Sequence, residues 1–358
     1  MRFVFKTSYA QDLRPFKDGV QASWYLALLG CLLVAPFVLP DYLRTQVTFI
    51  FIYAVVGFGL MLLSGFTGQL SMGHAAFLAI GAYTEAILQN QGVPFVLSAP
   101  IAMLLSSLAG VAIGLPALRL TGIYLAIATL SFGFIVEEAL ARFDWLTGGN
   151  SGMMLVGLNV VGFNVEWDYG FYYLALVCTV LVGLACHNLL RSPTGRAFVA
   201  IRDSEISAQS MGVSLGAFKT LSFAISAAFT GLAGALYAHK IQFISPEQFN
   251  LFVSIEFLMM IVIGGMGSLH GAVFGAIFVI VLPELIGWLK DYLPGYIVEQ
   301  PGLKPTLFGI IMILFVLFEP LGLYGRWVKI RTYFSMFPLY RAGMFDRQKA
   351  YQKSERVR

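Results

Sequence analysis

Long apolar runs dominate the chain, and short polar segments separate them. A helix needs about 20 mostly apolar residues to cross a bilayer. On that basis the sequence predicts ten membrane spans, at 22–40, 46–63, 70–89, 96–116, 120–141, 169–190, 220–238, 251–264, 271–288 and 305–321. The span at 251–264 is short, and the one at 70–89 has the small residues typical of a broken or re-entrant segment. We therefore expect an all-α polytopic membrane protein with about ten transmembrane helices.

Lys and Arg are unevenly distributed between the segments that join these spans. With the N-terminus in the cytoplasm, the inside segments carry eighteen of these residues and the outside segments carry five. Basic residues favour the cytoplasmic side, so both termini are predicted to be cytoplasmic. The domain organisation then follows. It comprises a cytoplasmic segment at 1–21, a transmembrane domain at 22–325 with a cytoplasmic loop at 191–219, and a basic cytoplasmic tail at 326–358 that is suited to anionic lipids.

Composition agrees with this pattern. Hydrophobic residues make up 58% of the chain and charged residues 12%, against about 45–50% and about 25% in soluble domains. Such a composition excludes a soluble enzyme, a nucleic-acid binder and a disordered chain. The four histidines have no metal-ligand spacing. No catalytic constellation and no metal site are predicted.

Six glutamates lie within or at the ends of the predicted spans: Glu85, Glu137, Glu138, Glu256, Glu284 and Glu319. A charge inside a membrane is costly and by default suggests a functional site. Each of these glutamates lies near a span end, where a carboxylate can reach the interface or cap a helix, and this interpretation is favoured. The adjacent pair Glu137 and Glu138 fits it least, because neighbours on a helix point about 100° apart.

Two glycine-rich stretches, 65–74 and 264–271, interrupt the apolar runs. A broken helix exposes backbone groups that need a cavity, a substrate or a neighbouring chain. We expect these stretches to form the translocation path or its gate. The candidate residues are Gly68, Gln69, Ser71, Gly73, His74, Gly264, Gly265, Gly267 and Ser268. The second stretch lacks the spacing of a nucleotide-binding loop, so no ATP site is predicted in this chain.

Small residues recur every fourth position in several spans, most clearly at Ser222, Ser226, Thr230, Gly234 and Ala238. Such stripes let helix backbones approach closely in lipid. They can serve packing within this chain or packing against a second membrane subunit, and the sequence leaves both open.

The polar loop 191–219 contains a predicted short helix. Ser192 and Pro193 are typical of a helix start, and Met211 with Gly212 is typical of a stop. Small and apolar residues fall on one narrow face, at Ala197, Ala200, Ile201, Ser204, Ala208 and Met211. This face suits docking into a groove on another protein. The alternative is an amphipathic loop that lies on the membrane.

Five motifs, in order along the chain, resemble one family. They are TGQLSMGHAAFLAIGAY (67–83), TGIYLAIATLSF (121–132), LTGGNSG (146–152), SPTGRAFVAIRDSEISAQSMGV (192–213) and IGGMGSLHGAVFGA (263–276). They resemble the LivM-type permease subunit of branched-chain amino acid ABC importers over roughly residues 46–323. The motifs are less specific for substrate, because importers of urea and short-chain amides use similar permeases.

The resemblance implies a type II-like ABC importer permease bundle in a bacterial inner membrane. Its partners would be a sister permease, two cytoplasmic ATPase subunits, a periplasmic amino acid-binding protein and membrane lipids, with no nucleic acid. No cofactor is expected in this chain, since ATP and Mg²⁺ would bind the ATPases. An ion-coupled secondary transporter and a membrane enzyme are the less favoured alternatives.

The resemblance also implies that the loop is the coupling helix that docks into the ATPase. The residues expected to couple are Arg196, Ile201, Arg202, Asp203, Glu205, Ala208 and Gly212. The wider importer pattern there is EAA-x-x-x-G, whereas this chain has Ile206-Ser207-Ala208-x-x-x-Gly212. The Glu is missing from its position and Glu205 stands one residue earlier. Whether Glu205 replaces that carboxylate is open.

Overall fold

The computed structural model describes residues 19–118, 120, 122–155, 157, 159–160, 163–164, 169–290, 303–319 and 321–336. Two compact units share these residues. The larger unit is Gly30–Tyr324, and the smaller holds the described residues of the two terminal segments. The predicted cytoplasmic loop and both glycine-rich stretches lie in the larger unit. Residues 1–18 of the predicted segment 1–21 and residues 337–358 of the predicted tail 326–358 lie outside the described residues.

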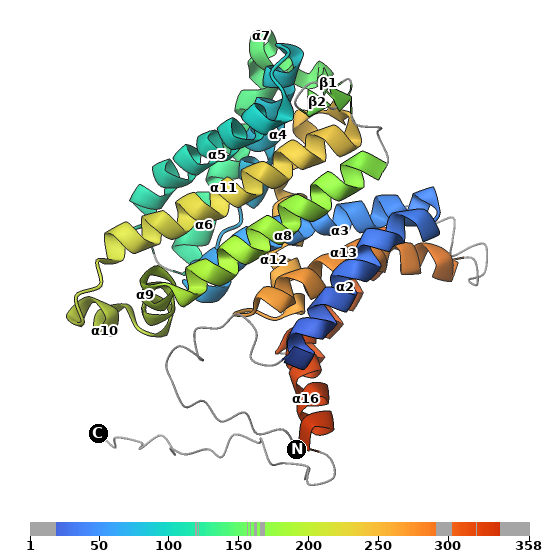
Figure 1. Cartoon of the computed structure of the whole chain (residues 1–358). Coiled ribbons are helices and arrows are strands. Elements are labelled where there is room, and N and C mark those ends of the chain that lie inside the picture. Colours follow the sequence, from blue (N-terminus) through green and yellow to red (C-terminus); the bar gives the residue numbers. More distant parts are fainter. Residues whose placement is uncertain are drawn as a thin grey trace. The chain divides into compact units, whose positions relative to one another are not determined.

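Helices make up most of the described chain (Figure 1). The α-helices are α2 (Gly19–Val38), α3 (Asp41–Leu60), α4 (His74–Asn90), α5 (Phe95–Ala117), α6 (Ile123–Arg142), α7 (Asp144–Thr147), α8 (Tyr169–Arg191), α9 (Pro193–Asp203), α10 (Glu205–Ser210), α11 (Leu215–Ile241), α12 (Leu251–Gly264), α13 (Leu269–Lys290), α15 (Leu303–Phe318) and α16 (Gly322–Met336). A π-helix, η1 (Met61–Phe66), extends α3, and two 3-10 helices are η2 (Gly149–Ser151) and η3 (Pro246–Phe249).

Two short antiparallel strand pairs complete the described structure. Strand β1 (Met153–Met154) pairs with β4 (Phe243–Ile244), and β2 (Asn159–Val160) pairs with β3 (Phe163–Asn164). Each of these strands has only two residues, and the other described elements are helices, so the all-α fold class is confirmed.

The number of spans is smaller than the ten predicted. Seven helices of the described chain are long and apolar enough to cross a membrane by length and composition, and an eighth qualifies if Thr306–Phe318 and Gly322–Phe334 form one broken span. The segment 251–264, predicted as doubtful, qualifies because η3 lengthens it to Pro246–Gly264. By contrast, α4 has 17 residues, because residues 67–73 before it are not helical. The non-helical part of the predicted stretch 65–74 thus begins at Thr67, since η1 continues to Phe66.

Two spans form the centre of the larger unit. The spans Asp41–Phe66 and Leu215–Ile241 are each 78% buried, whereas α6 is 17% buried. Helix α11 packs against α3, α4 and α5. A Cβ at Gly81 of α4 would lie 2.1 Å from the carbonyl oxygen of Gly231, so these two backbones nearly touch. The small-residue stripe of α11 is therefore used for packing within this chain.

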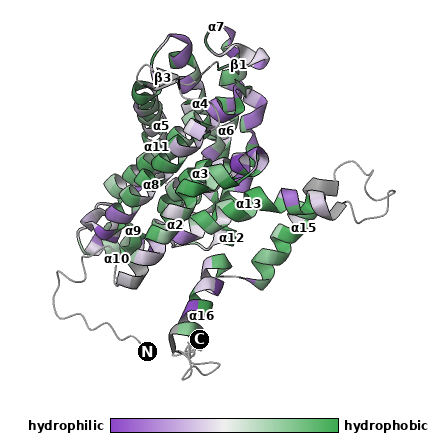
Figure 2. Cartoon of the chain, turned by 45° about the vertical axis from the view of Figure 1, so that its right-hand side comes forward, coloured by the Kyte–Doolittle hydropathy of each residue, from purple (hydrophilic) through white to green (hydrophobic). Residues whose placement is uncertain are grey.

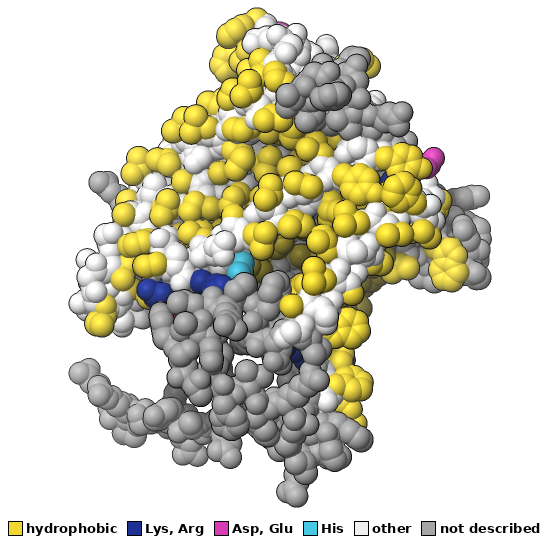
Figure 3. Space-filling model, viewed as in Figure 1, with side chains coloured by type: hydrophobic (Ala, Val, Ile, Leu, Met, Phe, Trp, Pro, Cys, Tyr) yellow, Lys and Arg dark blue, Asp and Glu magenta, His cyan; other side chains and the backbone are white. Residues whose placement is uncertain are grey.

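Polarity follows the long axis of this helix bundle. Hydrophilic residues gather at the end that carries α9 and α10 and at the opposite end near α7 and β3, while the helices between are hydrophobic (Figure 2). The surface between the two ends is largely apolar (Figure 3). On α6, large apolar side chains such as Ile123, Ile127 and Phe134 are exposed. The predicted cytoplasmic loop and the predicted outer loops thus lie at opposite ends of the bundle, as a spanning orientation requires.

Glu85 does not reach the surface, contrary to the favoured interpretation of the span glutamates. Its side chain is fully buried on α4. One carboxylate oxygen, Oε1, accepts a hydrogen bond from Ser98 Oγ at 2.7 Å and lies 2.9 Å from His239 Nε2. Neighbouring helices α5 and α11 supply these partners, so the carboxylate joins three helices. The wrong prediction arose because a position near a helix end says nothing about which neighbouring elements cover it.

Replacing Glu85 with Ala is expected to destabilise the protein by about 3 kcal/mol, because it leaves the buried Nε2 of His239 without its partner and removes the shortest hydrogen bond of Ser98. The matched control is Glu138→Ala. Glu138 is an exposed carboxylate that pairs with Arg142 one turn later, and exposed pairs contribute little. Thermal unfolding of the detergent-purified chain measures both. Equal unfolding temperatures for the two variants would contradict the structural role of Glu85.

Candidate functional site

The predicted coupling loop folds as two short helices in place of one. Ser192 caps α9, with its Oγ accepting from Gly195 N at 3.4 Å, and Pro193 occupies the first turn. Ser204 has extended backbone angles and ends α9. Its Oγ then caps α10 by accepting from Ser207 N at 3.3 Å. Serine competes with helix continuation by offering the backbone a cap, which explains why the predicted helix divides at Ser204.

Gly212 ends α10 as predicted. Its φ is +85°, a left-handed conformation in which glycine has no steric penalty. The N–H of Val213 donates to Ala208 O at 3.0 Å, so the last turn closes as in a glycine C-cap. A Cβ at Gly212 would meet open space. The position therefore faces away from the chain, where a partner could lie.

Half of the predicted face points inward, which differs from the predicted docking orientation, whereas Met211 of the same face points outward. Ala197 and Ile201 are buried because α9 packs against α8 and α11, and Ala208 is buried because α10 packs against α9 and α11. The outward apolar side chains are Ile206 and Met211, which are 81% and 86% exposed. A docking contact with another protein would use these two residues. The helical spacing located the face, but it could not indicate which of the two sides the bundle covers.

Glu205 has a partner within the chain. Its carboxylate lies 2.7 Å from the Nζ of Lys219, whose side chain is buried at the start of α11. This ion pair fixes α10 to α11. The exposed side of Glu205 still faces the surroundings, since its side chain is 42% exposed.

Arg202 links the loop to both glycine-rich stretches. Its Nη1 donates to Gly65 O at 3.1 Å, and Nε and Nη2 both donate to Asp203 Oδ1. A Cβ at Gly68 would lie 3.1 Å from Arg202 Cγ, and one at Gly267 would lie 3.2 Å from Arg202 Nη1. The guanidinium thus lies between two breaks that are far apart in sequence.

The two glycine-rich stretches also contact each other directly. The N–H of Gly267 donates to the Sδ of Met61 at 3.2 Å. A Cβ at Gly65 would lie 2.9 Å from Gly267 N. Gly264 and Gly271 approach equally closely within the second stretch, where a Cβ at Gly264 would lie 1.9 Å from Gly271 O. The candidates Gly264, Gly265, Gly267 and Ser268 therefore form a tight turn between α12 and α13.

The first stretch ends in a buried polar network on α11. His74 has Nδ1 2.8 Å from Ser71 Oγ and Nε2 2.8 Å from Ser226 Oγ. Gln69 Nε2 donates to Ser222 Oγ at 3.4 Å. A Cβ at Gly73 would lie 2.0 Å from Thr129 O. These contacts hold residues 67–73 between α6 and α11. Of the predicted candidates, Gln69 and His74 bond to α11 directly, and Ser71 bonds to His74.

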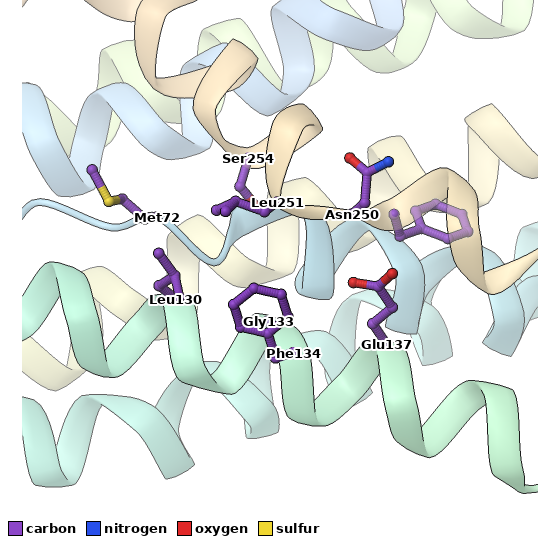
Figure 4. Close-up of a pocket in the computed structure, with 9 residues that line it drawn as sticks. Met72, Leu130, Gly133, Phe134, Glu137, Asn250, Leu251 and Ser254 are labelled. Atoms are coloured by element: carbon purple, nitrogen blue, oxygen red, sulfur yellow. The ribbon is translucent and has the colours of Figure 1, made fainter.

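A pocket lies beside this non-helical segment, between α6 and the start of α12 (Figure 4). Its cavity volume is about 10 Å³, which is room for about one water molecule. The polar lining residues are Glu137, Asn250 and Ser254, and apolar residues of both helices form the walls. Sequence analysis singled out Glu137 but missed Asn250 and Ser254. Their only sequence signal is that Asn250 precedes an apolar run, as a helix cap does.

Among the described residues, no group of three or more His, Cys, Asp or Glu could hold a metal ion.

These features define a polytopic α-helical membrane protein with a pair of short helices at one polar end. A polytopic helical bundle carries a docked helical pair at one polar end, and Arg202 connects that pair to two broken segments. The chain belongs to the family described as branched-chain amino acid transport system / permease component, whose model matches residues 42–316. The resemblance inferred from the five motifs is thereby confirmed.

Three relatives illustrate the similarity. The high-affinity branched-chain amino acid transport system permease protein LivM of Escherichia coli is 36% identical, and the match covers 86% of this chain and 77% of that protein. The LivM of Salmonella typhimurium is 35% identical with the same coverage. A probable branched-chain amino acid transport permease protein LivM of Methanocaldococcus jannaschii is 26% identical over 62% of this chain and 67% of its own length. No solved structure matches the chain.

Proposed function

We propose that this chain is a transmembrane permease subunit of an ATP-driven importer that moves leucine, isoleucine and valine inward by alternating access. Its family, and the names of the relatives that resemble it over most of their length, support this proposal. The chain itself has no catalytic role in it. ATP and Mg²⁺ bind partner ATPase subunits. These subunits lie in the cytoplasm, where they contact α9 and α10 of this chain.

The observation that carries the mechanism is the hydrogen bond from Arg202 to Gly65 O. ATP binding draws the ATPases together and moves the helical pair that docks on them. Arg202 transmits this movement to the two glycine-rich stretches, which contact each other at Gly65 and Gly267. Such stretches are suited to a gate, because their backbone conformations are less constrained than those of a helix.

The remaining partners follow from the same proposal. A sister permease completes the membrane unit, and a periplasmic binding protein delivers the amino acid from the outer side. The complex lies in a bacterial inner membrane, with the N- and C-termini of this chain in the cytoplasm. Lys and Arg in the tail 326–358 contact anionic lipids.

Labelled-leucine uptake into proteoliposomes tests the proposal. The vesicles contain this chain with its sister permease, ATPases and binding protein, with and without ATP and with no ion gradient. We expect uptake that needs ATP and that isoleucine and valine compete. Uptake of urea or an amide in place of leucine would change only the substrate. Uptake driven by an ion gradient alone would overturn the importer mechanism.

A further inference from the structure

Lys219 is a buried cation whose counter-charge comes from the helical pair α9 and α10. It lies near the start of α11, with its side chain 5% exposed. Its Nζ lies 2.7 Å from Oε1 of Glu205, the first residue of α10. Within the described part of the chain, no other carboxylate pairs with Lys219. A buried ammonium group that loses its partner is costly, so this ion pair holds the start of α10 against α11 (Figure 1).

The next turn of α11 holds the first glycine-rich stretch. Ser222 Oγ donates to the main-chain oxygen of Lys219 at 2.8 Å, and it accepts from Gln69 Nε2 at 3.4 Å. The main-chain oxygen of Gln69 accepts from Ser64 Oγ at 2.9 Å. All four of these residues are buried. A displacement of Lys219 therefore reaches Gln69 through a single intervening side chain.

The helical pair thus has two attachments to the first glycine-rich stretch, one from each helix. Arg202 of α9 donates to Gly65 O at 3.1 Å. Glu205 of α10 acts on Gln69 through the ion pair and the start of α11. Ser204, with extended backbone angles, divides the two helices. The attachments act at different residues of the stretch, so neither can replace the other.

Helix α11 is suited to carry movement because it lies at the centre of the larger unit. Its span is 78% buried, and it packs against α3, α4 and α5. One turn beyond Ser222, the Oγ of Ser226 lies 2.8 Å from His74 Nε2 at the end of the same stretch. Small shifts of packed helices are a common form of conformational change. A shift of α11 would therefore move the stretch at both Gln69 and His74.

We infer that Glu205 and Lys219 are positioning residues of a second coupling link, which carries movement of α10 through α11 to the first glycine-rich stretch. This inference rests on the proposed function and deepens it. It also assigns a role to the carboxylate beside the missing Glu of the EAA-x-x-x-G pattern, because that carboxylate binds the chain's own lysine. Contact with the ATPases is left to outward side chains such as Ile206 and Met211.

The test reverses the ion pair in the complete importer, reconstituted with saturating binding protein and ATP. Glu205→Lys places an ammonium group beside that of Lys219, and we expect leucine uptake per ATP hydrolysed to fall about tenfold or more. Lys219→Glu alone is expected to lower it similarly. The exchanged pair, Glu205→Lys with Lys219→Glu, restores the attraction. It is expected to recover uptake per ATP to within about threefold of the wild type.

A neutral pair separates coupling from stability. Glu205→Gln with Lys219→Met removes both charges, and apolar replacement of a buried ion pair costs little stability. We expect the wild-type unfolding temperature, because no buried charge is left without a partner. Uptake per ATP is expected to stay severalfold below that of the wild type, because the attraction between α10 and α11 is absent.

Wild-type uptake per ATP in Glu205→Lys or in the neutral pair would overturn the link. An exchanged pair that assembles with its ATPases but stays uncoupled would overturn it as well. Weaker co-purification of the ATPases with every Glu205 variant would instead place that carboxylate at the docking surface. If the wild type takes up no amino acid with ATP, the proposed function itself fails and the link falls with it.

Discussion

Replacing Arg202 with Glu is expected to abolish leucine uptake while the chain still inserts in the membrane and assembles with its ATPases. The substitution removes the donor to Gly65 O and places a carboxylate beside that carbonyl and beside Asp203. Both are acceptors, so the loop is repelled from the break that it holds. ATP hydrolysis is expected to continue, because α9 and α10 retain their outward side chains. The result is an uncoupled importer, measured as uptake per ATP hydrolysed.

The matched control for this prediction is Arg196→Glu. Arg196 is exposed on the same helix, and within the described part of the chain its side chain bonds only to Arg191 O, through Nη1. The charge change is identical, but the contact with Gly65 remains. Any loss of leucine uptake in this variant comes from a weaker docking surface, and it is accompanied by weaker co-purification of the ATPases. Wild-type uptake by Arg202→Glu, or loss of the ATPases from that complex, would contradict the internal link.

Much of the fold follows from local pattern. Membrane helices reveal themselves by length and hydropathy, so the helical class, most spans and the break after Phe66 were predictable. The caps at Ser192 and Gly212 were predictable for the same reason, because a cap depends on a few adjacent residues. The division at Ser204 was missed, although serine there carries the same signal as at Ser192.

Contacts between distant segments were not predictable from one sequence. Arg202 and Gly65 are 137 residues apart, and nothing in the loop indicates that its arginine turns toward a membrane break. The same limit explains Ile201 and Ala208, whose helical spacing is equally compatible with a buried or an exposed face. For Glu137, the sequence suggested a functional site. The pocket beside it also needs α12 and Met72, which lie far from Glu137 in the chain.

Replacing Gly234 with Ala is expected to disrupt the central packing, because α11 and α4 are in backbone contact there. A Cβ at Gly234 would lie 2.1 Å from Leu78 O and 2.9 Å from Ala82 N. Both are main-chain atoms of α4, so no side chain can rotate away and the helix itself must move. Overpacking that has no relief costs about 3 kcal/mol or more. The same movement would displace His74 from Ser226 and thereby disturb the start of α4.

Gly216 provides the control on the same helix. A Cβ there would meet only Leu118 Cδ1, at an ordinary 3.6 Å. Gly216→Ala is therefore expected to leave the unfolding temperature unchanged or slightly higher, since alanine is favoured over glycine in helices. Gly234→Ala is expected to lower that temperature by several degrees and to reduce the yield of assembled importer. Equal unfolding temperatures of the two variants would contradict the backbone contact between α4 and α11. The small-residue stripe would then be available for packing against a second subunit.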